Sequence, residues 1–310
     1  MTRRQAGALT LLALIWGSSF MFIKVAVRGY DPTALAWLRL LLAAAVLVPV
    51  VLAVHRRRSI REGRDAATRL VVLGIVNSAL PFLLISWAET RIDSGLTAIL
   101  QAAAPLFMVV LAVPFAEERV TGTRLLGVGV GFLGVVLLAG AQTGGELVAA
   151  LAVVLAAFFY AMGGMFASRA LRGTEPLVTA AGGTLAAAIL LTPLGLARLP
   201  ADVPGWNETA SVVVLGVVGT GIAYIVFFAL LPRIGPSRAV LVTYLIPAVA
   251  LVYGAVLLGE EVTLVALGGL ALILGGVALA GRGRPRAAAV RTTAGEGAPG
   301  LAAEDRRISG

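Results

Sequence analysis

Long apolar stretches separated by short polar breaks make up the chain from its start to about residue 281. A helix needs roughly 20 apolar residues to cross the hydrocarbon core of a bilayer. The breaks between the stretches carry residues that end helices, such as Asp31-Pro32, Gly235-Pro236 and a basic run from His55 to Arg69. We therefore predict ten membrane-spanning helices, at residues 6–27, 33–54, 70–88, 94–116, 123–141, 146–168, 177–198, 209–230, 236–258 and 263–281.

The second half of the chain repeats the first at an offset of 142 residues. Residues 74–138 align without gaps on 216–280 and share Arg91/Arg233, Pro105/Pro247, Glu118/Glu260, Gly127/Gly269 and Gly134/Gly276. Membrane transporters are commonly built from two internal repeats with a binding site at their interface. We divide the chain into a five-helix unit over 1–141, a second over 146–281, and a tail over 282–310 that is expected to be disordered.

The arginines predict how the helices are oriented in the membrane. Seventeen arginines lie at the N-terminus, in alternate connections and in the near tail, whereas the opposite connections hold only Arg28, Arg91 and Arg198. Cytoplasmic connections carry the excess of basic residues, so both termini are expected in the cytoplasm. Because each unit has an odd number of helices, the second must enter the membrane from the opposite side. Two inverted units provide a physical basis for alternating access.

Composition supports a membrane protein and narrows its chemistry. Hydrophobic residues make up 59% and charged residues 13% of the 310 positions, and the mean hydropathy is +0.96. A soluble domain carries about twice that charged fraction. The net charge of +9 comes from arginines between apolar stretches, so we expect no nucleic-acid partner. With no cysteine, one histidine and no G-x-x-x-x-G-K-S/T loop, we expect no cofactor, no metal and no nucleotide hydrolysis.

Several short motifs recur in order along this layout. They are WGSSF (Trp16 to Phe20), Pro32 followed by Leu38-Arg39, Ala98 through Pro105, Glu118-Arg119-Val120, and in the second unit Pro247, Glu260 and the Gly269/Gly276 spacing. With them the chain resembles the EamA-type transporters of the drug/metabolite transporter superfamily over residues 8–281. The resemblance implies an all-α membrane protein that moves small polar metabolites, often by export of amino acids or related compounds, across the bacterial plasma membrane. Tyr160 stands at the position of Trp16 and Gly183 at that of Arg39, so the two halves are expected to contribute unequal contacts.

Prolines interrupt three of the predicted helices. A proline inside a helix leaves the carbonyl four residues earlier without its hydrogen bond. We predict that the prolines act as hinges and that the residues with freed carbonyls line a central cavity; the alternative is kinks stabilised by local side-chain bonds. The pairs are Pro81 with Asn77, Pro105 with Gln101, and Pro247 with Thr243.

Arg39 lies about two turns inside the second predicted helix. A charge near the bilayer centre costs about 2.5–3.5 kcal/mol and by default marks function. We predict that Arg39 pairs with a substrate carboxylate; the alternative is that it extends to the headgroups or binds a helix end. The other residues predicted to bind substrate are Trp16, Ser19, Tyr160, Tyr224 and Tyr244.

The remaining charged and small residues have mainly structural interpretations. Lys24 is expected to extend to the membrane surface, and Glu89 to lie at a solvated interface, with a proton relay as the alternative. Glu118 and Glu260 are expected to cap or end their own helices, with gating as the alternative. Glycines in the fifth and tenth helices are expected to pack between the repeats or between protomers of a possible homodimer.

These features favour a secondary transporter that moves a small polar molecule across the bilayer by alternating access, with export as the expected direction. The alternatives are a passive channel, a sensor that does not transport, and a membrane enzyme acting on lipid-linked substrates. The enzyme is disfavoured because His55 lies in an arginine run and no cluster of His, Asp and Glu is expected to face one cavity. The expected partners are a small-molecule substrate and the lipid bilayer of the bacterial plasma membrane.

Overall fold

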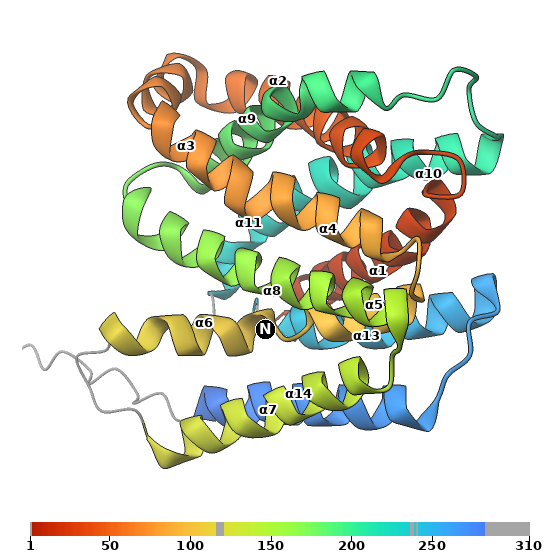
Figure 1. Ribbon diagram of the computed structural model, residues 1–310. Helices are drawn as coiled ribbons and strands as arrows, with labels where there is room; N and C mark the ends of the chain where they lie inside the picture. Colours follow the sequence, from red (N-terminus) through yellow and green to blue (C-terminus); the bar gives the residue numbers. More distant parts are fainter. Residues whose placement is uncertain (1, 116–120, 236–238, 240, 283–310) are drawn as a thin grey trace, which may run out of the picture.

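The computed structural model describes residues 2–115, 121–235, 239 and 241–282, and all regular secondary structure in this part is helical (Figure 1). Glu118 and the predicted disordered tail beyond Arg282 lie outside the described residues. Within the described ranges, ten helical segments are long and apolar enough to cross a membrane, which agrees with the ten predicted from sequence. Their bounds are Arg3–Ala26, Pro32–Val54, Ala67–Ala88, Ser94–Ala112, Gly122–Gly140, Gly144–Ala170, Pro176–Ala197, Trp206–Ile234, Leu241–Leu258 and Leu264–Gly281.

Several spans are composed of shorter elements. The first unit contains α1 (Arg3–Ala26), α2 (Pro32–Asp65), α3 (Ala67–Gly74), the π turn η1 (Ile75–Ala79), α4 (Leu80–Ala88), α5 (Ser94–Gln101), α6 (Ala104–Ala112), the 3-10 turn η2 (Val113–Phe115) and α7 (Gly122–Gly140). The second contains α8 (Gly144–Ala170), α9 (Pro176–Ala197), α10 (Trp206–Gly216), the π turn η3 (Val217–Ile222), α11 (Ala223–Ile234), α13 (Leu241–Tyr253), the π turn η4 (Gly254–Leu258) and α14 (Leu264–Arg282).

The second helix of each unit begins in the same way. Asp31 accepts a hydrogen bond from the backbone of Thr33 before Pro32, and Glu175 accepts one from the backbone of Val178 before Pro176. An acidic cap satisfies a backbone N–H that has no partner within the helix, and proline is well tolerated at the first helical position. The acidic residue followed by proline therefore sets where α2 and α9 start.

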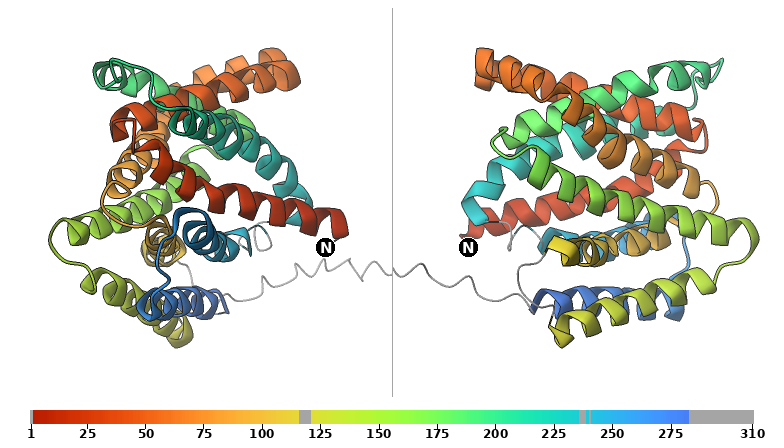
Figure 2. Two further views of the ribbon diagram at one scale, coloured as in Figure 1. Left: turned by 90° about the vertical axis from the view of Figure 1, so that its right-hand side faces the viewer. Right: turned by 60° about the vertical axis from the view of Figure 1, so that its left-hand side comes forward.

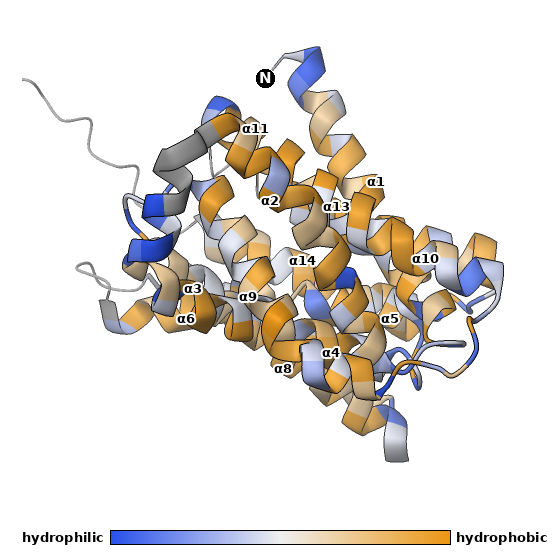
Figure 3. Ribbon diagram, turned by 90° about the horizontal axis from the view of Figure 1, so that it is seen from above, coloured by the Kyte–Doolittle hydropathy of each residue, from blue (hydrophilic) through white to orange (hydrophobic). Residues whose placement is uncertain are grey.

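Repeat-related helices pack in pairs, as expected for two inverted units. Helix α2 runs along α9 on one side of the molecule, and α7 runs along α14 on the other (Figures 1 and 2). Between these pairs, α1 packs on α13, and α8 packs on α6 in the corresponding way. The helices are predominantly apolar, and hydrophilic residues gather mainly at their ends and connections (Figure 3).

Glycines allow α7 and α14 to approach each other closely. A side chain at Gly127 or Gly276 would overlap backbone atoms of the opposite helix, and one at Gly134 would lie 2.9 Å from the carbonyl oxygen of Gly269. Small residues permit this kind of backbone approach between membrane helices. These glycines therefore pack between the two repeats of one chain rather than between protomers.

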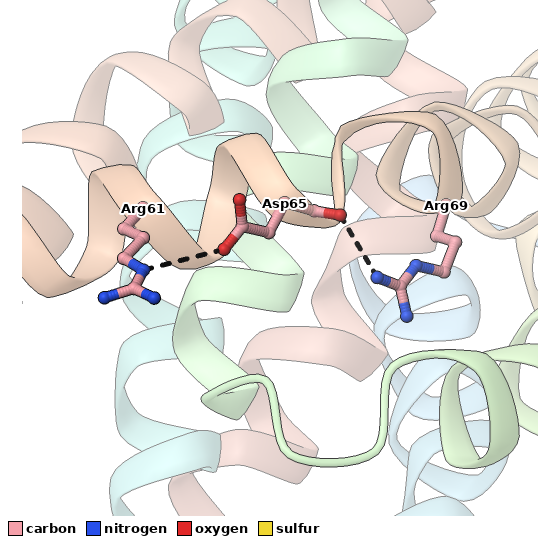
Figure 4. Close-up of polar contacts among 3 residues, drawn as sticks. All are labelled: Arg61, Asp65 and Arg69. Carbon is pink, nitrogen blue, oxygen red and sulfur yellow. Dashed lines mark hydrogen bonds and ion pairs between the residues drawn. The ribbon is translucent and has the colours of Figure 1, made fainter.

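The basic run from His55 to Arg69 was predicted to be a break, but most of it is helical. Helix α2 continues to Asp65, whose carboxylate lies 3.8 Å from the guanidinium of Arg61 (Figure 4). The side chain of Arg69 donates to the carbonyl oxygens of Asp65 and Ala170, at 3.1 and 2.8 Å. Residues that are too polar for the hydrocarbon core still have good helix propensity, so the helix extends beyond the apolar stretch.

Candidate functional site: a cavity between the two repeats

A cavity of about 440 Å³ lies at the centre of the bundle and is lined by helices of both repeats. Ligand pockets typically have volumes of about 300–1,000 Å³. Eight of the nine residues predicted to bind substrate line this cavity: Trp16, Ser19, Arg39, Asn77, Gln101, Tyr160, Tyr224 and Thr243. Two of the three predicted hinge prolines, Pro105 and Pro247, also line it.

Two predicted residues lie elsewhere. Tyr244 packs against the buried cluster that includes Leu100 and Ile273. Consecutive residues of a helix point about 100° apart, so Thr243 faces the cavity and Tyr244 does not. Pro81 is buried at the start of α4, directly after the π turn η1, and is not among the cavity-lining residues.

The two π turns η1 and η3 occupy repeat-related positions, because residues 75–79 correspond to 217–221 at the 142-residue offset. A π turn inserts an extra residue into a helix and is often found at functional sites. In η1 it places Asn77 on the cavity, and in η3 it places Gly219 there. Proline alone does not explain these turns, because Ala223 stands at the position equivalent to Pro81.

Arg39 is buried at the cavity and is only 9% exposed. Its Nε donates to the hydroxyl of Thr220 at 3.0 Å, and that hydroxyl donates to the carbonyl oxygen of Leu215 at 3.0 Å. The guanidinium carbon lies 4.0 Å from the centre of the Phe82 ring. The charge is therefore held inside the protein, and the alternative in which it extends to the headgroups is wrong. Sequence reasoning missed Thr220; its repeat-related partner is Ser78, another hydroxyl in an apolar span.

Gln101 presents an acceptor that the described residues leave without a partner. Its Oε1 is buried and accepts no hydrogen bond. The residue ends α5, and α6 begins only at Ala104, ahead of Pro105. A buried acceptor without a partner costs about 1–3 kcal/mol.

The other polar residues of the cavity are partly held by the protein. The Ser19 hydroxyl donates to the carbonyl oxygen of Ile15 at 2.9 Å, and the Trp16 ring lies 5.4 Å from that of Phe227. A side chain at Gly163 would overlap Asn77, so this glycine gives the amide its space. The apolar part of the wall comes from Phe20, Ile23, Phe82, Ile85, Met108 and Ile246.

The central cavity has a neighbouring cavity toward one end of the bundle. A second cavity of about 410 Å³ shares Trp16, Asn77 and Tyr224 with it and extends to Ser168 and Thr174. We call this the Ser168 end. At the opposite end, a polar cavity of about 720 Å³ includes Lys24, Glu146 and Glu260 and shares no lining residue with the central one. We call this the Lys24 end.

A closed layer separates the central cavity from the polar cavity. Gly95 lines the polar cavity and Ala98 the central one, so the layer is about one turn of α5 thick. The carboxylate of Glu260 accepts from the backbone N–H and the hydroxyl of Ser94, both at 2.9 Å, and from the backbone N–H of Gly95 at 3.0 Å. The expectation that Glu260 caps its own helix is wrong, because it caps α5 of the other repeat.

Lys24 belongs to the same layer. Its ammonium donates to the backbone carbonyls of Glu89 and Ile92, at 3.0 and 2.8 Å. These carbonyls follow the last residue of α4, where the negative end of the helix dipole favours a cation. Lys24 therefore holds the turn after α4 in place, and the prediction that it extends to the membrane surface is wrong.

Glu89 follows the last residue of α4 and is fully buried, with 0% exposure. Neither carboxylate oxygen has a hydrogen-bond partner among the described residues. Burial raises the pKa of this carboxyl group well above its ordinary value, and the charge of Lys24 opposes the shift. The predicted solvated position is wrong, because the turn held by Lys24 folds the side chain into the protein.

In the part of the chain that the structure describes, ten helices long enough to span a membrane form two inverted units around a shared cavity, which is an architecture typical of membrane transporters. The profile of the EamA-like transporter family matches residues 6–140 and 147–282. The chain belongs to this family, and it is a multi-pass protein of the bacterial inner membrane.

The relatives it resembles also carry transporter names. It is 30% identical to the "Uncharacterized transporter YdfC" of Bacillus subtilis (strain 168), over 86% of this chain and 88% of the relative. It is 32% identical to the "Probable terminal-alkyne amino-acid exporter" of Streptantibioticus cattleyicolor, over 89% and 92%. It is 27% identical to the "Probable amino-acid metabolite efflux pump" of Salmonella typhimurium, over 89% and 94%.

One crystal structure superposes on this fold with a TM-score of 0.65, covering 90% of this chain and 98% of the other. The two sequences are 22% identical, so the likeness shows the fold alone.

Proposed function

We propose that this transporter is a secondary exporter of amino acids or related metabolites with an apolar side chain. The observation that carries the proposal is the central cavity, in which a buried cation and an acceptor without a partner lie in an otherwise largely apolar wall. Arg39 would bind the substrate carboxylate, since a guanidinium donates strong charge-assisted hydrogen bonds to a carboxylate. Gln101 Oε1 would accept from the substrate amino group.

The apolar wall and the aromatic rings complete this recognition. Phe20, Ile85 and Met108 offer apolar surface for a side chain, and Trp16 and Tyr160 offer ring faces that attract a cationic amino group. The names of the relatives in Streptantibioticus cattleyicolor and Salmonella typhimurium support this substrate class.

The inverted repeats and the difference between the two ends support alternating access as the mechanism. At the Lys24 end the polar cavity shares no lining residue with the central one, whereas at the Ser168 end a second cavity shares three of them. The arginine distribution supports a cytoplasmic location for the Ser168 end. This arrangement is the one an exporter needs when it loads substrate from the cell.

The test is counterflow in liposomes containing the purified protein. Vesicles preloaded with one unlabelled amino acid at a time should accumulate the same radiolabelled amino acid, with saturation, and leucine-like substrates should be preferred. Arg39→Ala and Gln101→Ala should lose this exchange, whereas Arg198→Ala, a change outside the cavity, should keep it. Flux that neither saturates nor responds to preloading, for every amino acid tried, would exclude the proposal and indicate a channel.

A further inference from the structure

The Glu89 carboxyl group has no part in the proposed substrate site, yet it is the most completely buried carboxyl group of the described residues. Taking an ionised carboxylate out of water costs several kcal/mol unless hydrogen bonds or an ion pair compensate. Neither oxygen of Glu89 has a hydrogen-bond partner among the residues that the structure describes. A group in this position generally takes up a proton.

Glu260 in the same layer shows the opposite environment. Its carboxylate accepts three hydrogen bonds from the start of α5. The two carboxyl groups of this layer therefore differ in their hydrogen bonding, since Glu260 accepts three hydrogen bonds and Glu89 accepts none from the described residues.

Three charged groups act on Glu89 from the elements around it: Lys24 of α1, Arg39 of α2, and Glu260. Both cations are engaged elsewhere, Lys24 with backbone carbonyls and Arg39 with Thr220 and Phe82. Their attraction opposes protonation, and the repulsion from Glu260 favours it. Burial has the largest effect and raises the pKa of Glu89.

The position of Glu89 links its charge to the closed layer. One turn before it, Ile85 lines the central cavity, and three residues after it, Ile92 lines the polar cavity at the Lys24 end. If the helices of the closed layer moved apart, water would reach the Glu89 carboxyl group and favour its ionised form. The repeat-related position holds Leu231, so only the first unit carries this group.

We propose that Glu89 is a proton-binding site that controls the Lys24 end of the transporter. The carboxyl group holds a proton while the layer is closed and gives it to water when the layer opens; closure takes a proton back from water. The inference rests on the proposed alternating access, and no bond of the substrate changes.

The first experiment observes the proton directly. Infrared spectra of the reconstituted protein at neutral pH should contain a protonated carboxyl band that Glu89→Gln removes. Asp31→Asn is the matched control, since it makes the same change at a helix cap outside the layer, and it should keep the band. A Glu89→Gln spectrum identical to the wild type would overturn the inference.

The second experiment links the proton to opening and needs no substrate. Because the chain has no cysteine, Ala98→Cys can report access to the central cavity. Val203→Cys identifies the side of the membrane on which the Lys24 end lies, because Val203 is 83% exposed and its neighbour Pro204 contacts Gly29 at that end. A membrane-impermeant thiol reagent is added on that side. The Val203→Cys rate also corrects for ionisation of the thiol.

The reaction rate of Ala98→Cys, divided by that of Val203→Cys, should rise by up to about tenfold per pH unit, because each opening of the layer releases one proton. The rise should begin near the ordinary carboxyl pKa of about 4.3 and end near the raised pKa of Glu89. Glu89→Gln should make the rate slow and independent of pH, and Glu89→Asp should keep a pH dependence. An unchanged pH dependence in Glu89→Gln would overturn the inference. Loss of counterflow for every amino acid, with this pH dependence intact, would instead count against the proposed substrate class alone.

Discussion

Arg39 Nε lies 3.0 Å from Thr220 Oγ1, and this hydrogen bond joins α2 of the first repeat to the π turn η3 of the second. Of the described arginines, Arg39 alone lines the central cavity, and this bond fixes it there. The backbone of the π turn in turn orients the hydroxyl, through its bond to the carbonyl oxygen of Leu215. The cation of the site therefore depends on both units, although only the first carries it.

Arg39→Ala is expected to lower the transport efficiency of an amino acid by about 30-fold or more, because losing one partner of a buried, hydrogen-bonded charge pair costs about 2–5 kcal/mol. Arg39→Lys should recover only part of this loss, since lysine lacks the planar fork of the guanidinium. Initial rates of counterflow over a range of substrate concentrations measure the effect. Thr220→Ser keeps the hydroxyl and should remain close to the wild type; equal losses in Thr220→Ser and Arg39→Ala would contradict a direct role of the charge.

Gln101→Met is expected to stabilise the empty protein while weakening transport. The change keeps a long side chain and removes a buried acceptor that costs about 1–3 kcal/mol when it has no partner. Thermal unfolding in detergent should show a higher Tm, and counterflow should show a higher KM. A lower Tm would mean that Gln101 Oε1 already has a partner in the empty protein.

Glu260→Gln is expected to loosen the closed layer, since an amide cannot accept all three hydrogen bonds that the carboxylate accepts from Ser94 and Gly95. Ala98→Cys should then react faster from the Lys24 end. Glu261→Gln is the matched control, because it removes the same charge from the adjacent exposed residue. If both substitutions speed the reaction equally, general electrostatics and not the cap of α5 keeps the layer closed.

The sequence predicted the spans, the duplication and most of the polar residues of the cavity, because each depends on local apolar length or on residue type. It did not predict what Lys24, Glu89 and Glu260 contact. Glu260 meets Ser94 across 166 residues of chain, and Lys24 meets the carbonyl oxygen of Glu89 across 65. Such contacts depend on how the helices rotate and cross, and an apolar stretch carries little information about either.

The apolar wall was missed for a related reason. Phe82 and Ile85 line the cavity, whereas Leu133 is 62% exposed on the outside of the bundle, and their sequence surroundings are similarly apolar. In a membrane helix the lipid-facing side and the cavity-facing side are both hydrophobic. Hydropathy therefore identifies the span but does not identify which of its faces binds a ligand.

Gly276→Ala is expected to destabilise the protein, because the added methyl group would overlap the backbone of Gly127 and Gly131 across the α7–α14 contact. Overpacking of a close contact typically costs about 1–3 kcal/mol. Gly275→Ala is a strict control, since nothing lies within 4 Å of a methyl group there and alanine is the better helix former. Thermal unfolding in detergent should therefore move in opposite directions, with a lower Tm for Gly276→Ala and an equal or higher Tm for Gly275→Ala. A Tm for Gly276→Ala at or above that of the wild type would show that the two repeats do not pack at this distance.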